Sequence, residues 1–296
     1  MRAGGWPAHR GARRWAVPDA LTDVLVSTPR PVEPATWRAA RDAARALLTA
    51  PSSAASRAGD GRFRVTEHDI RRALHDASPP ASEIERPFAW TARTARRPLG
   101  LAAVRALVAG DAPTPVEAVR SRVAESSRLV HGGSHRAAQL DRWLAGLSPA
   151  GRAAVGAEAV TWCTRLWTAV DWDALGTRLV IGRDHWWDSP QSALLALRGR
   201  AEVRTGRAHL VVLSGPRRAS VRAELALVLL VEALRSRDDA PPGLAVGWWP
   251  DSGHLVRVEP EPAALALAAE AVTRVLAQGS ALTGEAPEGS GVRPAA

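Results

Sequence analysis

The stretch from Leu194 to Gln278 is the part of this chain that most constrains its fold. Its apolar runs lie at 194–204, 209–214, 220–235 and 262–278, with a hairpin pattern between 246 and 259. Short alternating or β-branched runs separated by turn residues predict strands, and the longer apolar runs predict helices. The order strand, strand, helix, strand, strand, helix therefore predicts an α/β domain.

Two segments of this stretch predict deep burial. The run from Ala208 to Leu213 is short and apolar, and Ser214-Gly-Pro ends it, which is typical of a strand buried on both faces. The helix expected at 220–235 has almost no polar face, so it is expected to pack on most sides, with Ser220 as its cap. The length of this helix is far below that of a membrane span.

Composition shifts and helix-start signals divide the chain into four regions. We expect a disordered basic tail at 1–33, a mostly helical basic region at 34–147, an α/β domain at 148–278 and a disordered tail at 279–296. Expected helix starts are Pro34, Thr66 with Asp69, Pro98, Thr114 with Glu117, and Ser148-Pro149. The segments 51–61, 78–87 and 131–135 are predicted linkers or loops.

Cysteine and apolar content limit the class of protein. Cys163 is the single cysteine, so an internal disulfide and a cysteine-based zinc site are excluded. We expect Cys163 to be a buried small hydrophobe within a helix whose tryptophans, among them Trp162, form a core stripe. No leader-like or membrane-spanning apolar segment is found, so we expect a cytoplasmic protein without a membrane partner.

Charge gives the clearest indication of a partner. The chain contains no lysine and no tyrosine, which excludes mechanisms that need a catalytic Lys or Tyr. Residues 1–150 hold 23 Arg against 14 acidic residues, a net +9, whereas residues 151–296 hold 16 of each. A basic half joined to a neutral half indicates an anionic partner, of which nucleic acid is the commonest. A solvated basic surface is the alternative.

Three arginines provide a specific candidate for phosphate binding. Arg93, Arg96 and Arg97 lie close to Trp90 in the sequence. Guanidinium groups bind phosphates, and an adjacent aromatic ring can stack on a base, so the cluster predicts a nucleic-acid-binding patch. The alternative is an exposed, solvated helix face.

The segment around Asp184 and Asp188 gives two interpretations. Two carboxylates and His185 within five residues could hold a hard metal ion. A polar loop anchored by Trp186 and Trp187, with Asp188 capping a turn, is the alternative.

Two short motifs lie within the C-terminal half, Gly199-Arg200-Ala201-Glu202 and Ser214-Gly215. Together with the order of elements, they resemble the PD-(D/E)XK nuclease superfamily, in particular its RecB-like branch. The first is similar to the Gly-Arg-x-Asp motif of that branch, and the second is similar to the end of its Asp-x-Lys motif. A helix, three strands, a helix and a further strand form the core of that superfamily, so the resemblance implies a nuclease-like mixed sheet flanked by helices. The resemblance implies that Glu202 is a metal-binding acid.

Other positions of the same motifs depart from the family. Val211 stands where the second acid is expected, Leu213 where the lysine is expected, and Glu224 and Val228 where Gln and Tyr are expected. Apolar side chains cannot replace a carboxylate around Mg²⁺. The resemblance therefore implies a catalytically degenerate nuclease fold.

Three hypotheses follow for function. The first is a non-catalytic nucleic-acid-binding or accessory protein that needs no cofactor and contacts phosphates through Arg93, Arg96, Arg97 and Arg200. The second is a divergent DNA nuclease in which Glu202 combines with Asp184 and Asp188 to hold Mg²⁺ or Mn²⁺. The third is a scaffold that binds a protein partner. In the first and third, Glu202 is a solvent-facing residue paired with Arg200 or Arg204.

Overall fold

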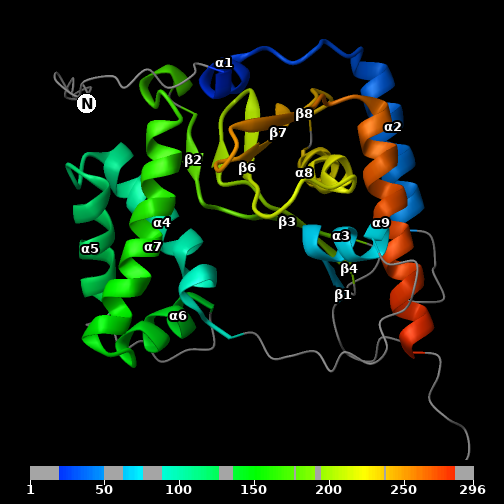
Figure 1. The fold of residues 1–296 in the computed structure, drawn as a ribbon. Coiled ribbons are helices and arrows are strands. Elements are labelled where there is room, and N and C mark those ends of the chain that lie inside the picture. The colour runs from blue at the N-terminus through cyan, green and yellow to red at the C-terminus, as the bar shows by residue number, and fades with distance from the viewer. Residues whose placement is uncertain are drawn as a thin grey trace, which may run out of the picture.

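The computed structural model describes residues 20–49, 63–75, 89–126, 136–176, 178–190, 195–236 and 238–283. Within these ranges the chain forms a mixed α/β fold, in which two mixed β-sheets are flanked by helices (Figure 1). The three segments expected to be linkers or loops lie outside the described residues. Residues 1–19 and 284–296 of the expected tails also lie outside them.

The larger sheet has five strands in the order β2-β5-β6-β7-β8. These strands are β2 (Val180–Ile181), β5 (Val203–Arg204), β6 (Ala208–Val212), β7 (Leu244–Trp249) and β8 (His254–Val258). Neighbours are antiparallel except β6 and β7, which are parallel and joined through helix α8 (Val221–Arg235). All five residues of β6 are buried, which confirms the expected buried strand. The expected hairpin is confirmed as β7 and β8.

The smaller sheet has the order β1-β4-β3. Its strands are β1 (Phe63–Val65), β3 (His185–Asp188) and β4 (Leu195–Gly199). Two expectations from the sequence were wrong here. The run expected as one strand at 194–204 divides into β4 and β5, because the chain passes from one sheet to the other between them. The segment expected as a polar loop is β3, whose backbone pairs with β4 in an antiparallel register.

Alternate residues of the central strands pack into two separate hydrophobic cores. Leu210 and Val212 belong to one core, and Val211 and Leu213 belong to the other. The first core is covered by α1 (Ala20–Val26), α4 (Ala92–Ala109), α5 (Pro115–Ser126), α6 (Arg136–Ala145) and α7 (Pro149–Thr168). The second is covered by α2 (Pro34–Thr49), α3 (Glu67–His75), α8 and α9 (Pro262–Thr283). Figure 1 shows the two groups of helices on opposite sides of the strands.

This division of the helices crosses the expected regions. Helices α2 and α3 of the region 34–147 pack with α8 and α9, whereas α4 and α5 pack with α7. Helix α1 belongs to the range expected to be a disordered tail, yet its Leu21 and Leu25 are buried. Likewise, α9 continues to Thr283, past the end expected at Gln278. Among the described residues, no helix has the length and apolar character needed to cross a membrane.

Most of the expected helix starts are confirmed by their local hydrogen bonds. The side chain of Ser148 accepts a hydrogen bond from the backbone of Gly151, and Thr114 and Thr66 make the expected contacts with Glu117 and Asp69. Ser220 is the N-cap residue of α8, as expected, but its hydroxyl makes no capping hydrogen bond and donates to the Glu224 carboxylate instead.

The start expected at Pro98 was also wrong. Helix α4 begins at Ala92, where Thr91 and Thr94 form a reciprocal capping box. Pro98 lies inside the helix. Arg93, Arg96 and Arg97 therefore belong to the same rigid helix as the buried residues that follow them.

Candidate nucleic-acid interface

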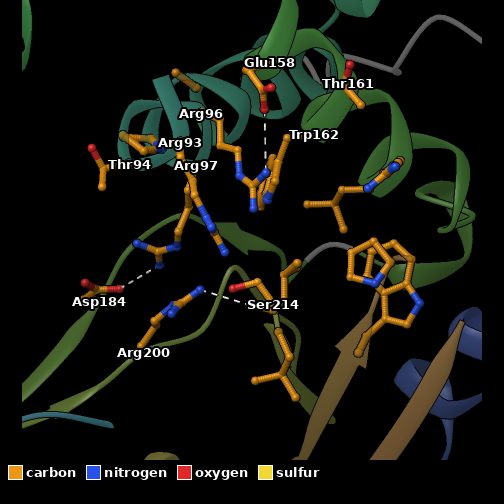
Figure 2. Close-up of a pocket in the computed structure, with 18 of the residues that line it drawn as sticks. Arg93, Thr94, Arg96, Arg97, Glu158, Thr161, Trp162, Asp184, Arg200 and Ser214 are labelled. Atoms are coloured by element: carbon orange, nitrogen blue, oxygen red, sulfur yellow. Dashed lines mark hydrogen bonds and ion pairs between the residues drawn. The ribbon is translucent and has the colours of Figure 1, made fainter. Parts of the chain in front are cut away.

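A cleft of about 620 Å³ lies between the helices α4 and α7 and the ends of strands from both sheets. Its floor includes the connection between β4 and β5 at Arg200 and the end of β6 at Val212 to Ser214. Figure 2 shows Arg96, Arg97 and Trp162 pointing from the helices into the space above Arg200 and Ser214. The point at which the chain changes sheets is thus the floor of the cleft.

The cleft is strongly basic. Its lining contains eight arginines, namely Arg93, Arg96, Arg97, Arg105, Arg122, Arg165, Arg198 and Arg200. It contains four carboxylates, namely Glu67, Glu158, Asp184 and Asp251, so eight positive less four negative charges leave an excess of four. Within the described part of the chain, Arg93 and Arg105 make no ion pair. A concave surface with one sign of charge concentrates oppositely charged ligands.

Glu202 lies below the floor of this cleft and is completely buried. Its Oε1 atom accepts hydrogen bonds from Arg97 Nε at 2.5 Å and from Arg200 Nε and Nη2 at 2.9 and 2.7 Å. The other oxygen, Oε2, accepts from the backbone N–H of Val212 at 2.8 Å. Burial would raise the pKa of Glu202, but Arg200 and Arg97 outweigh it and hold the pKa below its ordinary value. Glu202 is therefore an ionised carboxylate already neutralised by guanidinium groups.

Glu67, at the start of α3, gives the floor a second carboxylate, which is partly buried, with 12% of its side chain exposed. Both of its oxygens accept hydrogen bonds from Arg198 Nη2 at 2.8 Å, and Arg200 Nη1 lies 3.4 Å from Oε1. Burial raises the pKa of Glu67, but Arg198 and Arg200 lower it more, to about 2. Arg200 thus bridges the buried carboxylate of Glu202 and the partly buried carboxylate of Glu67, which fixes its position on the floor.

The structure brings together the four arginines expected to bind nucleic acid. Arg93, Arg96, Arg97 and Arg200 all line the cleft, although more than one hundred residues of sequence separate Arg200 from the other three. Arg97 also pairs with Asp184 at 3.4 Å, and Arg96 with Glu158 at 3.6 Å. The expected cluster of arginines beside Trp90 is therefore one wall of a larger basic cleft.

The residues considered as metal ligands do not form a site that fits Mg²⁺ or Mn²⁺. Asp184 faces the cleft but is paired with Arg97 and, at 3.9 Å, with Arg198. Asp188 lies at the far end of β3, where it is exposed and does not line the cleft. Both oxygens of Glu202 already accept hydrogen bonds, Oε1 from guanidinium N–H groups and Oε2 from the backbone N–H of Val212. Among the described residues, no group of three or more His, Cys, Asp or Glu could hold a metal ion.

The alternative expected for Glu202 was wrong about its exposure and right about its partner, which was expected to be Arg200 or Arg204. The side chain is buried and does not face solvent, and it pairs with Arg200 but not with Arg204. Arg204 instead hydrogen-bonds to Glu232, which also contacts His185. His185 and Arg204 thus belong to a network on the α8 side of the sheet, away from the cleft.

Aromatic rings complete the lining. Trp90, Trp162 and Trp248 line the cleft. The sequence predicted Trp162 to be core packing, and its ring does pack against the first core, but it also faces the cleft. A Cβ atom on Gly100 would lie 2.3 Å from Trp162 Cε3, so the absence of a side chain there lets the ring lie against α4.

Several lining residues were missed by sequence reasoning. Glu67, Arg105, Arg165 and Arg198 come from four elements, and none of them belongs to a recognisable motif. For Arg198, alternation along β4 gave a usable signal, because it is the one charged residue in an otherwise apolar strand. Cys163 agrees with its prediction, because it is fully buried and burial raises the pKa of its thiol to about 12.

The positions where the sequence departs from the PD-(D/E)XK motifs have apolar or ion-paired side chains. Val211 and Leu213 are buried in the second core, next to α8. Glu224 is buried and accepts hydrogen bonds from Arg71 and Arg218. Both oxygens of Glu224 therefore accept hydrogen bonds from guanidinium groups. Neither a protein-family model, nor a curated protein, nor a solved structure matches this chain.

Proposed function

We propose that this protein binds nucleic acid in the basic cleft without cleaving it, using a degenerate fold of the PD-(D/E)XK type. The observation that carries the proposal is the environment of Glu202. Its carboxylate is neutralised by Arg97 and Arg200, and when Glu202 is counted against the lining charges the cleft keeps an excess of three positive charges. Such an arrangement attracts a polyanion but supplies no metal-activated water.

The order of elements supports the fold part of the proposal. Helix α7 precedes the antiparallel strands β2, β5 and β6, and α8 then leads to β7, which is parallel to β6. Glu202 lies at the start of β5, directly beside the end of β6. This is the place where the resemblance expects a metal-binding acid.

The lining supports nucleic acid as the anionic ligand. Arg93 and Arg105 are exposed on α4 and make no ion pair with described residues, so they can contact phosphates without breaking an existing interaction. Trp90 and Trp162 provide aromatic rings close to these arginines. A cleft for a small inorganic anion would not need rings and cations spread over several elements.

The test is a salt titration of binding to fluorescent single- and double-stranded DNA and RNA. Replacing Arg93 and Arg105 by Gln removes two positive charges from the cleft and breaks no described ion pair. We expect weaker binding and a shallower slope of the logarithm of the binding constant against the logarithm of the salt concentration. For each lost phosphate contact, this slope is expected to decrease by about 0.7 on a single strand and by about 0.9 on duplex DNA. The matched control replaces Arg222 and Arg274, which are exposed on α8 and α9, and it is expected to bind like the wild type.

Parallel incubations with Mg²⁺, Mn²⁺ or EDTA separate the proposal from a divergent nuclease. We expect intact substrate under all three conditions. Cleavage that requires metal and is lost in Glu202→Gln would overturn the non-catalytic part of the proposal. Equal binding by the cleft and control variants, or no binding to any nucleic acid, would overturn the binding part and favour a scaffold for a protein partner.

A further inference from the structure

Trp186 is a large aromatic side chain left exposed beside the cleft. It lies on β3, an edge strand of the smaller sheet, and 38% of its surface is exposed. Its neighbour Trp187 faces the opposite side of the sheet and is buried. The strand does not need the Trp186 ring for core packing, because Trp187 fulfils that role. An exposed ring of this size on an edge strand calls for a specific explanation.

Two guanidinium groups lie over this ring. Arg64 from β1 lies 5.8 Å from the ring centroid, and Arg198 from β4 lies 6.0 Å from it. Trp186 and Arg198 are also direct partners in the pairing of β3 with β4. All three side chains therefore lie on one face of the smaller sheet. The combination of an exposed ring with adjacent cations is the arrangement that binds one base and its phosphates.

Arg198 connects this face to the cleft. It lines the cleft, donates to Glu67 on the floor and lies 3.9 Å from Asp184, which is two residues before Trp186. A ligand that contacts the floor at Arg198 can therefore reach Trp186 without crossing another element. Arg64, which is exposed and makes no ion pair in the described part of the chain, extends the positive charge further in the same direction.

We infer that the ligand is a single-stranded nucleic acid, and that it leaves the cleft across the smaller sheet with one base stacked on Trp186. This inference rests on the proposed function and specifies its ligand. A single strand is required because stacking needs an unpaired base whose face is accessible. The volume of about 620 Å³ lies within the range of small-molecule pockets, so the cleft holds a short segment and a longer strand must continue outside it. The Arg198–Trp186–Arg64 face is the continuation that the structure offers.

The test compares oligonucleotides of two lengths with the full chain. Binding of single-stranded DNA and RNA of about four and about twelve nucleotides is measured for the wild type, Trp186→Ala and Trp186→Phe. We expect Trp186→Ala to weaken binding of the long strand about five- to hundredfold, and binding of the short strand less than twofold. Trp186→Phe is expected to retain most of the affinity, because it keeps an aromatic face. Thermal melting of each variant confirms that the fold is intact.

Arg64→Gln provides an independent readout. For the long strand, it is expected to lower the slope of the logarithm of the binding constant against the logarithm of the salt concentration by about 0.7. For the short strand, the slope is expected to stay unchanged. If Trp186→Ala and the wild type bind the long strand equally, the path over Trp186 is wrong while the cleft proposal stands. Tighter binding of blunt duplex than of the long single strand would also overturn the inference and leave the cleft proposal intact. If the wild type binds no nucleic acid, both fail together.

Discussion

Replacement of Glu202 by Gln is the most direct test of how the floor of the cleft is stabilised. The carboxylate is completely buried and accepts four hydrogen bonds, three from guanidinium N–H groups and one from the backbone of Val212. A Gln side chain has nearly the same shape, but its NH₂ group is a donor. In either orientation of the amide, that group faces N–H donors of Arg97 and Arg200 or of Val212.

The expected cost follows from the burial of the ions. Removal of one partner of a buried ion pair costs about 3–5 kcal/mol, because the remaining charge is left without compensation. Arg97 and Arg200 keep 29% and 21% of their side-chain surface exposed, so water can partly solvate them. We therefore expect a loss at the lower end, about 3 kcal/mol. For a chain of this length, that corresponds to a decrease of about 6 °C in Tm.

Thermal and urea unfolding measure this loss, with Glu158→Gln as the control. Glu158 lines the same cleft, but its contact with Arg96 is 3.6 Å long and 52% of its side chain is exposed. Exposed pairs of this kind contribute under about 1 kcal/mol. If both variants melt within a degree of the wild type, the buried ion pairs do not stabilise the floor, and our account of Glu202 is refuted. Stabilisation of the wild type, but not of Glu202→Gln, by Mg²⁺ would instead identify Glu202 as a metal ligand.

Two further predictions test the surroundings of the same site. The pKa of Glu67 is about 2 against an ordinary value of 4.5, so its contribution to stability is complete above about pH 5 and is lost as the pH falls toward 2. Glu67→Gln is therefore expected to be about 3 kcal/mol less stable at pH 7, with a difference that shrinks in acid; a difference independent of pH in urea unfolding would contradict this. Gly100→Ala is expected to cost about 1–3 kcal/mol and to weaken nucleic-acid binding, because the added Cβ displaces the Trp162 ring. Its control, Gly156→Ala on α7, meets no atom within 4 Å and is expected to stabilise the helix by up to about 1 kcal/mol in the same unfolding assay.

The features that sequence predicted well depend on near neighbours in the chain. The caps at Thr114 and Ser148, the apolar character of α8 and the hairpin of β7 and β8 all follow from residues only a few positions apart. Pro98 shows the limit of such rules. Proline often begins a helix. Here, however, the capping box at Thr91 and the buried side chain of Ala95 favour a helix that already begins before Pro98.

The candidate site was predicted in part only, because its defining contacts join distant segments. The arginines beside Trp90 were identified from their own cluster, and Glu202 from its motif. Their contact was not predictable, since Arg97 and Glu202 are 105 residues apart. The run at 194–204 likewise hides a change of sheet, because both halves keep the same apolar alternation. Only the packed structure shows that this change of sheet brings Arg200 beneath α4.

The ion pairs at the edge of the cleft affect how it responds to salt. Arg96 pairs with Glu158, and Arg165 with Asp251, and at least half of each carboxylate side chain is exposed to water. These carboxylates serve as counterions that are covalently attached to the protein. A carboxylate that a polyanion displaces attracts a dissolved cation, which offsets one of the cations that the polyanion releases on binding. The affinity of the cleft for a polyanion will therefore depend less steeply on salt concentration than its eight arginines suggest.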